Sequence, residues 1–195
     1  ENLILALGRP KCGLLVDGEH RELPSTSPVM CGLSGRENIL FGHADGTISS
    51  FKGEEICKES TSIESLTCIE QGFVAALDNG DLVARTPNSE QIWTASGPQV
   101  TTQSAGFDDL HWCGRWDSIR GHLEVRSNSG EIMVSTETSR PRVSDFSENR
   151  IAFGFEDGQI LVWERELFER RSKQEKSEEN SRNSALAAKL RSLRK

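Results

Sequence analysis

The chain has 195 residues, of which 35% are hydrophobic, and a formal net charge of −7. Residues 1–163 carry a net charge of −11 and residues 164–195 carry +4, so the main body lacks the basic face that a phosphate backbone requires. This argues against nucleic acid as a partner of the body. No apolar stretch reaches membrane-spanning length, so we expect no membrane-bound part.

Short apolar runs that meet at a turn recur from the first residues onward. In the first copy, residues 3–16, two such runs flank a stretch that ends at Gly13. Asp-Gly or Asn-Gly pairs mark three later copies, and they favour hairpins because Gly and Asn tolerate positive φ. We place the five turns at Gly13, Gly46, Gly80, Gly121 and Gly158. Their spacing of 33, 34, 41 and 37 residues indicates one repeated unit.

Two further segments complete each unit. A second turn, followed by Glu and another apolar run, comes after each of the first four copies, at Asp17–Gly18, Lys52–Gly53, Pro87–Ser89 and Asn128–Gly130. A fourth segment precedes each copy from the second onward, at residues 27–34, 62–70, 101–109 and 141–149. Four short strands per unit, at a period near 36 residues, predict an all-β propeller of four-stranded antiparallel blades. A β-sandwich is the alternative, but it has no reason to repeat its turn chemistry at matching offsets.

The last copy, "RVSDFSENRIAFGFEDGQILVWE" at residues 142–164, carries a resemblance to a known family. It resembles a divergent WD-repeat blade, because Trp163 stands where the Trp-Asp pair of that family ends the third strand, with Glu164 in place of the Asp. The resemblance implies a propeller that serves as a non-enzymatic scaffold for binding other proteins. The predicted repeats cover approximately residues 1–27, 28–61, 62–96, 97–139 and 140–163, and a charged helical tail covers 164–195.

The first and last repeats are incomplete. The chain begins at the second strand of one blade and reaches the third strand of another, which leaves three whole blades between two three-stranded ones. WD-repeat rings usually have seven blades, so we expect the chain to be a fragment. Open strand edges invite pairing with other chains, and we expect the missing blades or strands to be supplied by upstream sequence or by another chain.

The tail differs from the repeats in composition. Residues 164–195 contain no Gly or Pro and favour helix, the first part extending to about residue 176 with Leu167 and Phe168 packed back on the last blade. Ser184 can cap a second helix over residues 184–195. One face of that helix carries Leu186, Leu190 and Leu193, and around them lie Lys189, Arg191, Arg194 and Lys195. We expect these residues to bind a partner protein; docking on the chain's own acidic blades and a solvated terminus are the alternatives.

Candidate chemistry is sparse. His111 and Cys113 share one face of a strand, with Asp117 and His122 nearby, but a nucleophile or metal site needs more converging groups. The aspartates before the turns fit turn capping, and Trp112 and Trp116 fit packing between blades. We therefore predict no catalytic, cofactor-binding or metal-binding residues and no enzymatic activity; the alternative is a propeller enzyme or small-ligand binder with its site at the channel mouth. Five scattered cysteines, without a C-x-x-C pair, predict reduced thiols and a cytoplasmic location.

Overall fold

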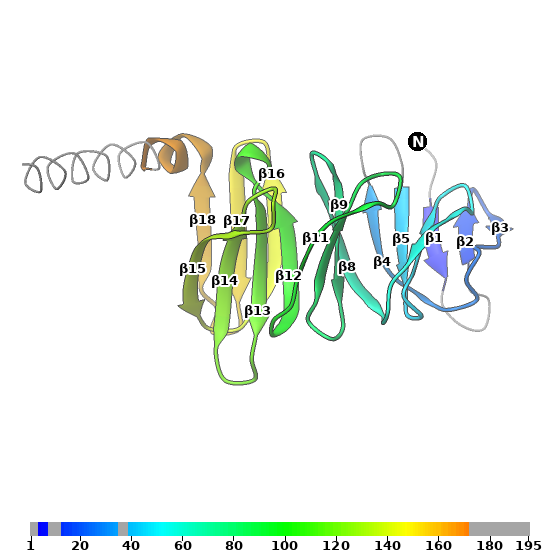
Figure 1. Cartoon of the computed structure of the whole chain (residues 1–195), viewed down its shortest axis with the longest axis horizontal. Coiled ribbons are helices and arrows are strands. Elements are labelled where there is room, and N and C mark those ends of the chain that lie inside the picture. The colour runs from blue at the N-terminus through cyan, green and yellow to red at the C-terminus, as the bar shows by residue number, and fades with distance from the viewer. Residues whose placement is uncertain (1–3, 8–12, 35–38, 172–195) are drawn as a thin grey trace, which may run out of the picture.

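The computed structural model describes residues 4–7, 13–34 and 39–171, and within these ranges the strands form five antiparallel sheets (Figure 1). Each sheet consists of strands that are consecutive in the chain, and we call the sheets blades A to E in chain order. Blades B, C and D have four strands each, and blades A and E have three described strands each. The predicted all-β propeller fold is confirmed, and within the described residues the sheets at the two ends have three strands each.

The strands are short throughout. Blades A and B comprise β1 (Ile4–Leu7), β2 (Gly13–Val16), β3 (Glu19–Arg21), β4 (Val29–Ser34), β5 (Ile39–His43), β6 (Thr47–Ser50) and β7 (Glu55–Lys58). Blade C comprises β8 (Ile63–Ile69), β9 (Gly72–Leu77), β10 (Leu82–Arg85) and β11 (Gln91–Ala95). Blades D and E comprise β12 (Gln99–Ala105), β13 (His111–Trp116), β14 (Gly121–Arg126), β15 (Ile132–Thr138), β16 (Pro141–Ser147), β17 (Arg150–Phe155) and β18 (Ile160–Glu164).

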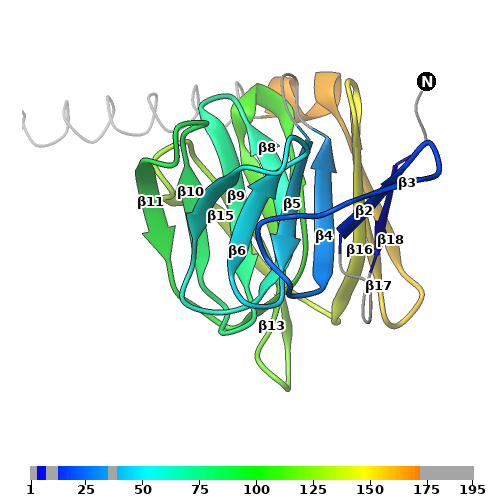
Figure 2. The same cartoon turned by 90° about the vertical axis from the view of Figure 1, so that its right-hand side faces the viewer.

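The blades radiate from a shared centre. Figure 2 shows the row of sheets from the end that carries β3, with the outer strands β11 and β18 on opposite sides of the view and the innermost strands β4 and β16 between them. Neighbouring blades contact one another chiefly through their innermost strands, β4 with β8, β8 with β12 and β12 with β16. This arrangement places the ends of the four innermost strands side by side.

The hairpin turns owe their shape to Gly and to the preceding polar residue. Gly46, Gly80 and Gly158 have φ values of +85°, +89° and +87°, which Gly adopts without strain. The Asp157 carboxylate accepts a hydrogen bond from the Gln159 backbone N–H at 2.9 Å, so this aspartate caps the turn, as expected.

The predicted turn at Gly121 was misplaced. Gly121 is the first residue of β14, and the turn before it has positive φ at Ser118 (+81°) and is capped by Asp117, which accepts the Ile119 and Arg120 backbone N–H groups at 2.8 and 2.6 Å. Gly13 likewise begins β2, and the loop that precedes it lies outside the described residues. At both sites the sequence carries no Asp-Gly or Asn-Gly pair, so the turn position was not marked.

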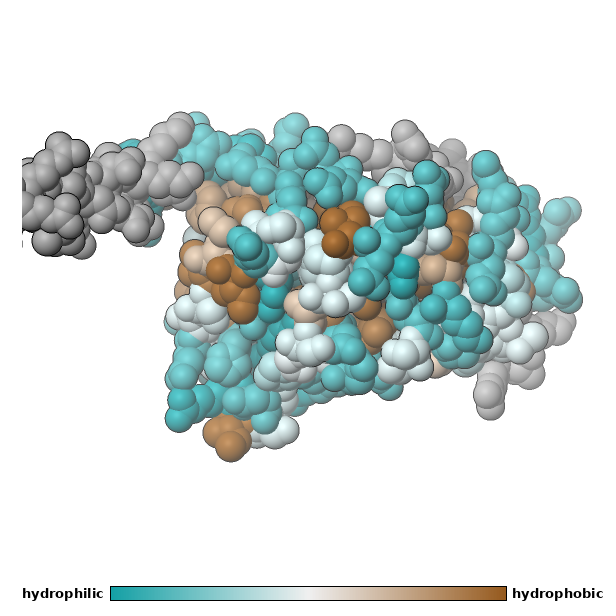
Figure 3. Space-filling view, viewed as in Figure 1, coloured by the Kyte–Doolittle hydropathy of each residue, from teal (hydrophilic) through white to brown (hydrophobic). Residues whose placement is uncertain are grey.

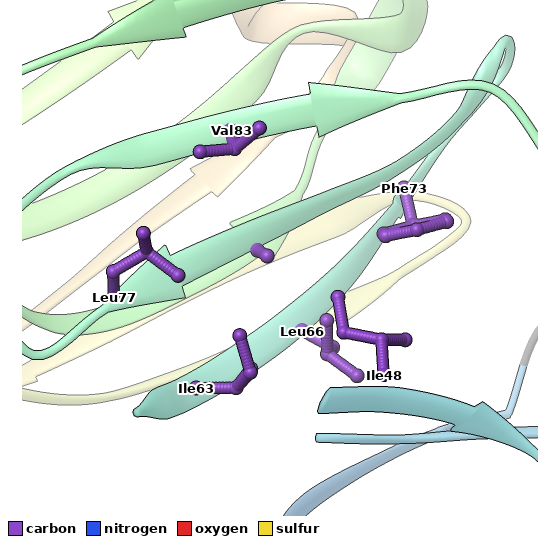
Figure 4. Close-up of a cluster of buried hydrophobic side chains, with 7 residues drawn as sticks. Ile48, Ile63, Leu66, Phe73, Leu77 and Val83 are labelled. Atoms are coloured by element: carbon purple, nitrogen blue, oxygen red, sulfur yellow. The ribbon is translucent and has the colours of Figure 1, made fainter. Parts of the chain in front are cut away.

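The core lies between blades rather than at one central point. In Figure 4, Ile48 of β6 in blade B points toward Ile63, Leu66 and Phe73 of blade C, and all four side chains are buried. Two further clusters join blade C to blade D and blade D to blade E. Trp112, 2% exposed, packs on Trp163 of blade E with ring centroids 5.0 Å apart, so its predicted role between blades is confirmed. Each blade is therefore stabilised mainly by packing against its neighbours in the row.

A small residue in the second strand lets the next blade approach closely. A Cβ atom at Gly42 of β5 would lie 2.5 Å from Cγ2 of Ile63, the first residue of β8. A Cβ atom at Gly114 of β13 would collide with Pro141, the first residue of β16. The same element of each following blade thus fills the space that a side chain would otherwise take.

The chain continues from β18 into a helix at residues 165–171. Phe168 packs on Phe107 and Trp112, with ring centroids 5.8 and 5.9 Å apart, so these ring contacts lie on blade D rather than on the last blade, where the sequence predicted them. Leu167 is 41% exposed, so its predicted packing on the last blade is wrong; the helix turns its Phe168 side toward blade D instead. No helix among the described residues combines the length and apolarity needed to cross a membrane.

Candidate functional site

A cleft of about 910 Å³ opens where the innermost strands end. Its lining residues come from the innermost strands β4, β8, β12 and β16, from β5, β7, β9 and the β10–β11 turn, from the loop 106–110 that contains the 3-10 turn η1 (Phe107–Asp109), and from the first residue of the C-terminal helix, Arg165. Because the blades contact one another through their innermost strands, the cleft is shared by blades B, C, D and E.

Apolar side chains form much of the cleft wall. They are neither fully buried nor fully exposed, and they come from all four blades, with Leu110 directly after η1: Leu33, Leu40, Ile56, Ile69, Leu110 and Phe146. Half-buried apolar surface in a concave site gains free energy when a ligand covers it. The wall therefore favours a ligand that brings apolar groups of its own.

Carboxylates stand around this apolar wall. Glu70, Asp108, Asp109 and Glu148 line the cleft, and Arg165 is the one cationic residue among its lining residues. Arg165 Nη1 pairs with Asp108 Oδ1 at 3.5 Å. Within the described ranges no Lys or Arg pairs with the carboxylates of the other three acids. We call this site, apolar wall and acids together, the acidic cleft.

The turn η1 fixes two of these acids. Asp108 and Asp109 have φ values of +53° and +59°, in the left-handed region that L-residues seldom occupy. The turn is held by Phe107, which is fully buried and packs edge-on against Phe146. Arg165 covers the Phe107 ring at 5.3 Å and donates to the Glu148 carbonyl at 3.1 Å. Strained backbone held by packing of this kind is concentrated at functional sites.

A second polar group lies buried between blades C and D. Glu124 Oε2 accepts from Arg115 Nε at 3.1 Å and from Arg126 Nη2 at 2.6 Å. Arg115, which is fully buried, also donates Nη1 to the Gly80 and Pro98 carbonyls at 2.7 Å each. These bonds tie the β9–β10 turn of blade C to the second strand of blade D, so we interpret the group as structural.

The structure does not bring together the four residues that the sequence analysis considered for a nucleophile or metal site, His111, Cys113, Asp117 and His122. His111 Nε2 bonds Gln103 Oε1 at 2.8 Å, while Cys113 Sγ lies 3.7 Å from Glu124 Oε2. Burial raises the pKa of the Cys113 thiol to about 11, which disfavours the thiolate. His122 and Asp117 contact each other at 3.4 Å, at the end of β13 away from His111. Among the residues that the structure describes, no three His, Cys, Asp or Glu side chains gather as metal ligands would.

Burial lowers the pKa of His111 from 6.5 to about 3, with Arg126 and Arg115 adding repulsion. The folded protein therefore keeps His111 neutral, while the unfolded chain protonates it below pH 6.5. The unfolding free energy is consequently unaffected by His111 above pH 6.5 and falls as the pH drops from 6.5 toward 3. We expect His111 to reduce the unfolding free energy by about 2 kcal/mol between pH 6.5 and 5. Urea unfolding of the wild type and of His111→Gln over this range measures the effect. Equal losses in the two proteins would contradict it.

The far side of blade E is an apolar sheet surface. Val143, Ile160 and Val162 are 63%, 68% and 55% exposed, and the strand register places them on one face with Ala152 and Gly154, next to the exposed Asp145. We call the five apolar residues the open face. Gly154 is the counterpart of Gly114, but a Cβ there would meet only Val143 of its own blade. Apolar surface gathers at the end of the molecule where β15 and β18 lie (Figure 3).

The predicted partner-binding residues of the tail fall outside the described residues, so Leu186, Leu190, Leu193, Lys189, Arg191 and Arg194 stay a prediction. Cys12 lies outside them too, and Cys31, Cys57, Cys68 and Cys113 form no disulfide with one another.

Sequence reasoning missed the acidic cleft. The sequence feature that could have indicated it is an acidic residue after the innermost strand of blades C, D and E, at Glu70, Asp108 and Glu148.

Comparison with known proteins identifies the fold but no family. No family model and no curated protein matches the chain. Among solved structures, BamB from Moraxella catarrhalis matches with a TM-score of 0.59 and 17% identity, over 68% of this chain and 42% of that one. BBS1N, in a complex with ARL6DN, matches with a TM-score of 0.63 and 12% identity, over 83% of this chain and 59% of that one. A chain of the mitotic checkpoint complex matches with a TM-score of 0.66 and 13% identity, over 84% and 57%.

These similarities support the β-propeller architecture. Identities of 12–17% show the fold alone. The chain spans about half the length of these three propeller chains.

Proposed function

We propose that the chain is a non-enzymatic protein-interaction scaffold whose acidic cleft binds a basic segment of a partner protein through an inserted apolar side chain. The observation that carries the proposal is the combination of an apolar wall with three carboxylates that no described cation neutralises. A basic segment would supply the missing charge, and its apolar side chain would cover the half-buried wall.

The composition of the cleft favours binding over catalysis. Its lining residues include no His, the side chain that most often serves as general acid or base, and no Lys. Two of the similar folds were solved within protein complexes, BBS1N with ARL6DN and the mitotic checkpoint complex, which supports protein partners. We also propose that the blades are of the WD-repeat type.

A peptide display selection on the full chain tests this function. We expect selected peptides to combine Lys or Arg with apolar residues, and we expect Glu70→Lys with Glu148→Lys to weaken their binding at least about tenfold, because two attractions become repulsions. Glu19→Lys with Glu131→Lys, on exposed acids outside the cleft, is the matched control and should change affinity little. Equal losses in the two double variants, or no enrichment of basic peptides, would refute the proposal.

We further propose that the open face is covered by another propeller blade, supplied by upstream sequence or by another chain. Support comes from Gly42 and Gly114, whose empty Cβ positions receive the first residue of the next blade, whereas Gly154 offers the same space without a described occupant. Ile160→Asp should leave the melting temperature of this chain within about 2 °C of the wild type, because Ile160 is 68% exposed, and should abolish association with a polypeptide that carries further blades. Unchanged association in a pull-down would exclude this surface.

A cytoplasmic location is part of the proposal. Burial raises the pKa values of Cys31 and Cys57 to about 12 and 11, which disfavours the thiolates through which disulfides form. Fractionation of the native protein tests the location, and recovery in a secreted or membrane fraction would contradict it.

A further inference from the structure

We propose that the C-terminal segment of this same chain, residues 184–195, binds in the acidic cleft and competes there with the partner. This inference rests on the proposed function, because it assigns a regulator to the same site. The segment lies outside the described residues.

Charge favours this occupant. Residues 184–195, "SALAAKLRSLRK", contain four cations and no acid, in a chain whose net charge is −7. The acidic cleft presents Glu70, Asp109 and Glu148 without a described cationic partner. Attraction between opposite charges is strongest within about 10 Å at moderate ionic strength, which a segment lodged in the cleft would satisfy.

The apolar pattern matches as well. Leu186, Leu190 and Leu193 recur at the spacing of one helical face, and a helix that presents such a face commonly binds in a hydrophobic groove. The half-buried wall side chains of the cleft offer apolar surface from four blades. A helix so short is marginal in water, so burial in the cleft would supply the free energy that its sequence alone lacks.

The chain is long enough to reach the site. Arg165 itself lines the cleft, and residues 165–171 form the helix that follows. From residue 171 to residue 184 an extended chain spans at most about 45 Å. A tether of this length holds the segment at an effective concentration of the order of 1 mM. A docking affinity of about 0.1 mM would then keep the cleft occupied about nine-tenths of the time and weaken partner binding about tenfold.

Carbodiimide cross-linking of the full chain, followed by mass spectrometry, tests the docking. The reagent joins amines to carboxylates in direct contact, so we expect links from Lys189 or Lys195 to Glu70, Asp109 or Glu148. In a mixture of isotopically light and heavy protein, these links should join residues of one isotopic type, because the segment docks within its own chain. Links distributed evenly over exposed acids such as Glu19 and Glu131, or links mainly between light and heavy chains, would overturn the inference.

Two variants with the same added charge separate docking from simple electrostatics. Leu190→Asp alters the leucine face, and Ser192→Asp places the same charge off that face. We expect Leu190→Asp to remove the cross-links and to tighten the binding of a display-selected cleft peptide about tenfold, and Ser192→Asp to have a much smaller effect on both. Equal effects of the two variants on cross-links and affinity would also overturn the inference.

The two proposals can fail independently. If the peptide binds the cleft but the tail never cross-links there, the inference is wrong and the proposed function stands. A second outcome is that the tail cross-links to the cleft, but the charge reversals at Glu70 and Glu148 do not weaken peptide binding, even when Leu190→Asp has released the tail. In that case the cleft is a docking site for the tail, and the proposed partner function is wrong.

Discussion

Gly114→Ala is expected to destabilise the protein by about 1–3 kcal/mol, whereas Gly154→Ala should change stability by less than about 0.5 kcal/mol. A Cβ atom at Gly114 collides with Pro141 of the next blade, while at Gly154 it meets only a terminal methyl group of the exposed Val143. The two glycines occupy corresponding positions in β13 and β17, so their intrinsic backbone preferences should largely cancel. The difference isolates packing between blades.

Urea unfolding of the two variants provides the measurement. A midpoint shift in Gly114→Ala with an unchanged slope would show that packing alone has changed. Equal destabilisation by Gly154→Ala and Gly114→Ala would contradict the claim that Gly114 allows the next blade to approach closely. If neither variant is destabilised, blades D and E do not pack as described.

Arg115→Met is expected to destabilise the protein by about 3 kcal/mol. The change leaves the Gly80 and Pro98 carbonyls without their buried donor and removes one of the two cations bound to Glu124. Met fills a similar volume, so a cavity should contribute little.

Arg120→Met is the control for this change. Arg120 pairs with Glu137 at 2.8 Å, but both side chains are more than half exposed, so its loss should cost less than about 1 kcal/mol. Thermal and urea unfolding of both variants give the comparison. A loss at Arg115 no larger than the loss at Arg120 would show that the buried group does not join blades C and D.

The sequence predicts the fold well because its turns are local. Asp-Gly and Asn-Gly pairs mark Gly46, Gly80 and Gly158, and the structure places a tight turn with positive φ at each. The turn before Gly121 uses Ser118 instead, and no dipeptide marks it. Local chemistry thus locates most hairpins, while a turn closed by an ordinary residue is placed only to within a few residues.

The acidic cleft was harder to predict because its residues come from four blades. Glu70 and Glu148 lie far apart in the chain and meet at one cleft because each follows an innermost strand. The buried contacts of Arg115 depend on the register between blades C and D, which no single repeat encodes. The exposure of Leu167 depends in the same way on where Phe168 packs.

Hydrogen–deuterium exchange of the full chain, with and without a display-selected basic peptide, tests the central claim most directly. Binding in the acidic cleft should slow exchange at the backbone amides of the segments 68–73, 105–110 and 146–148, which contain most of its lining residues. The same peptide should give no protection there in Glu70→Lys with Glu148→Lys. Protection confined to β15 or β18, or protection of the cleft that survives the double charge reversal, would contradict a scaffold that binds its partner in the acidic cleft.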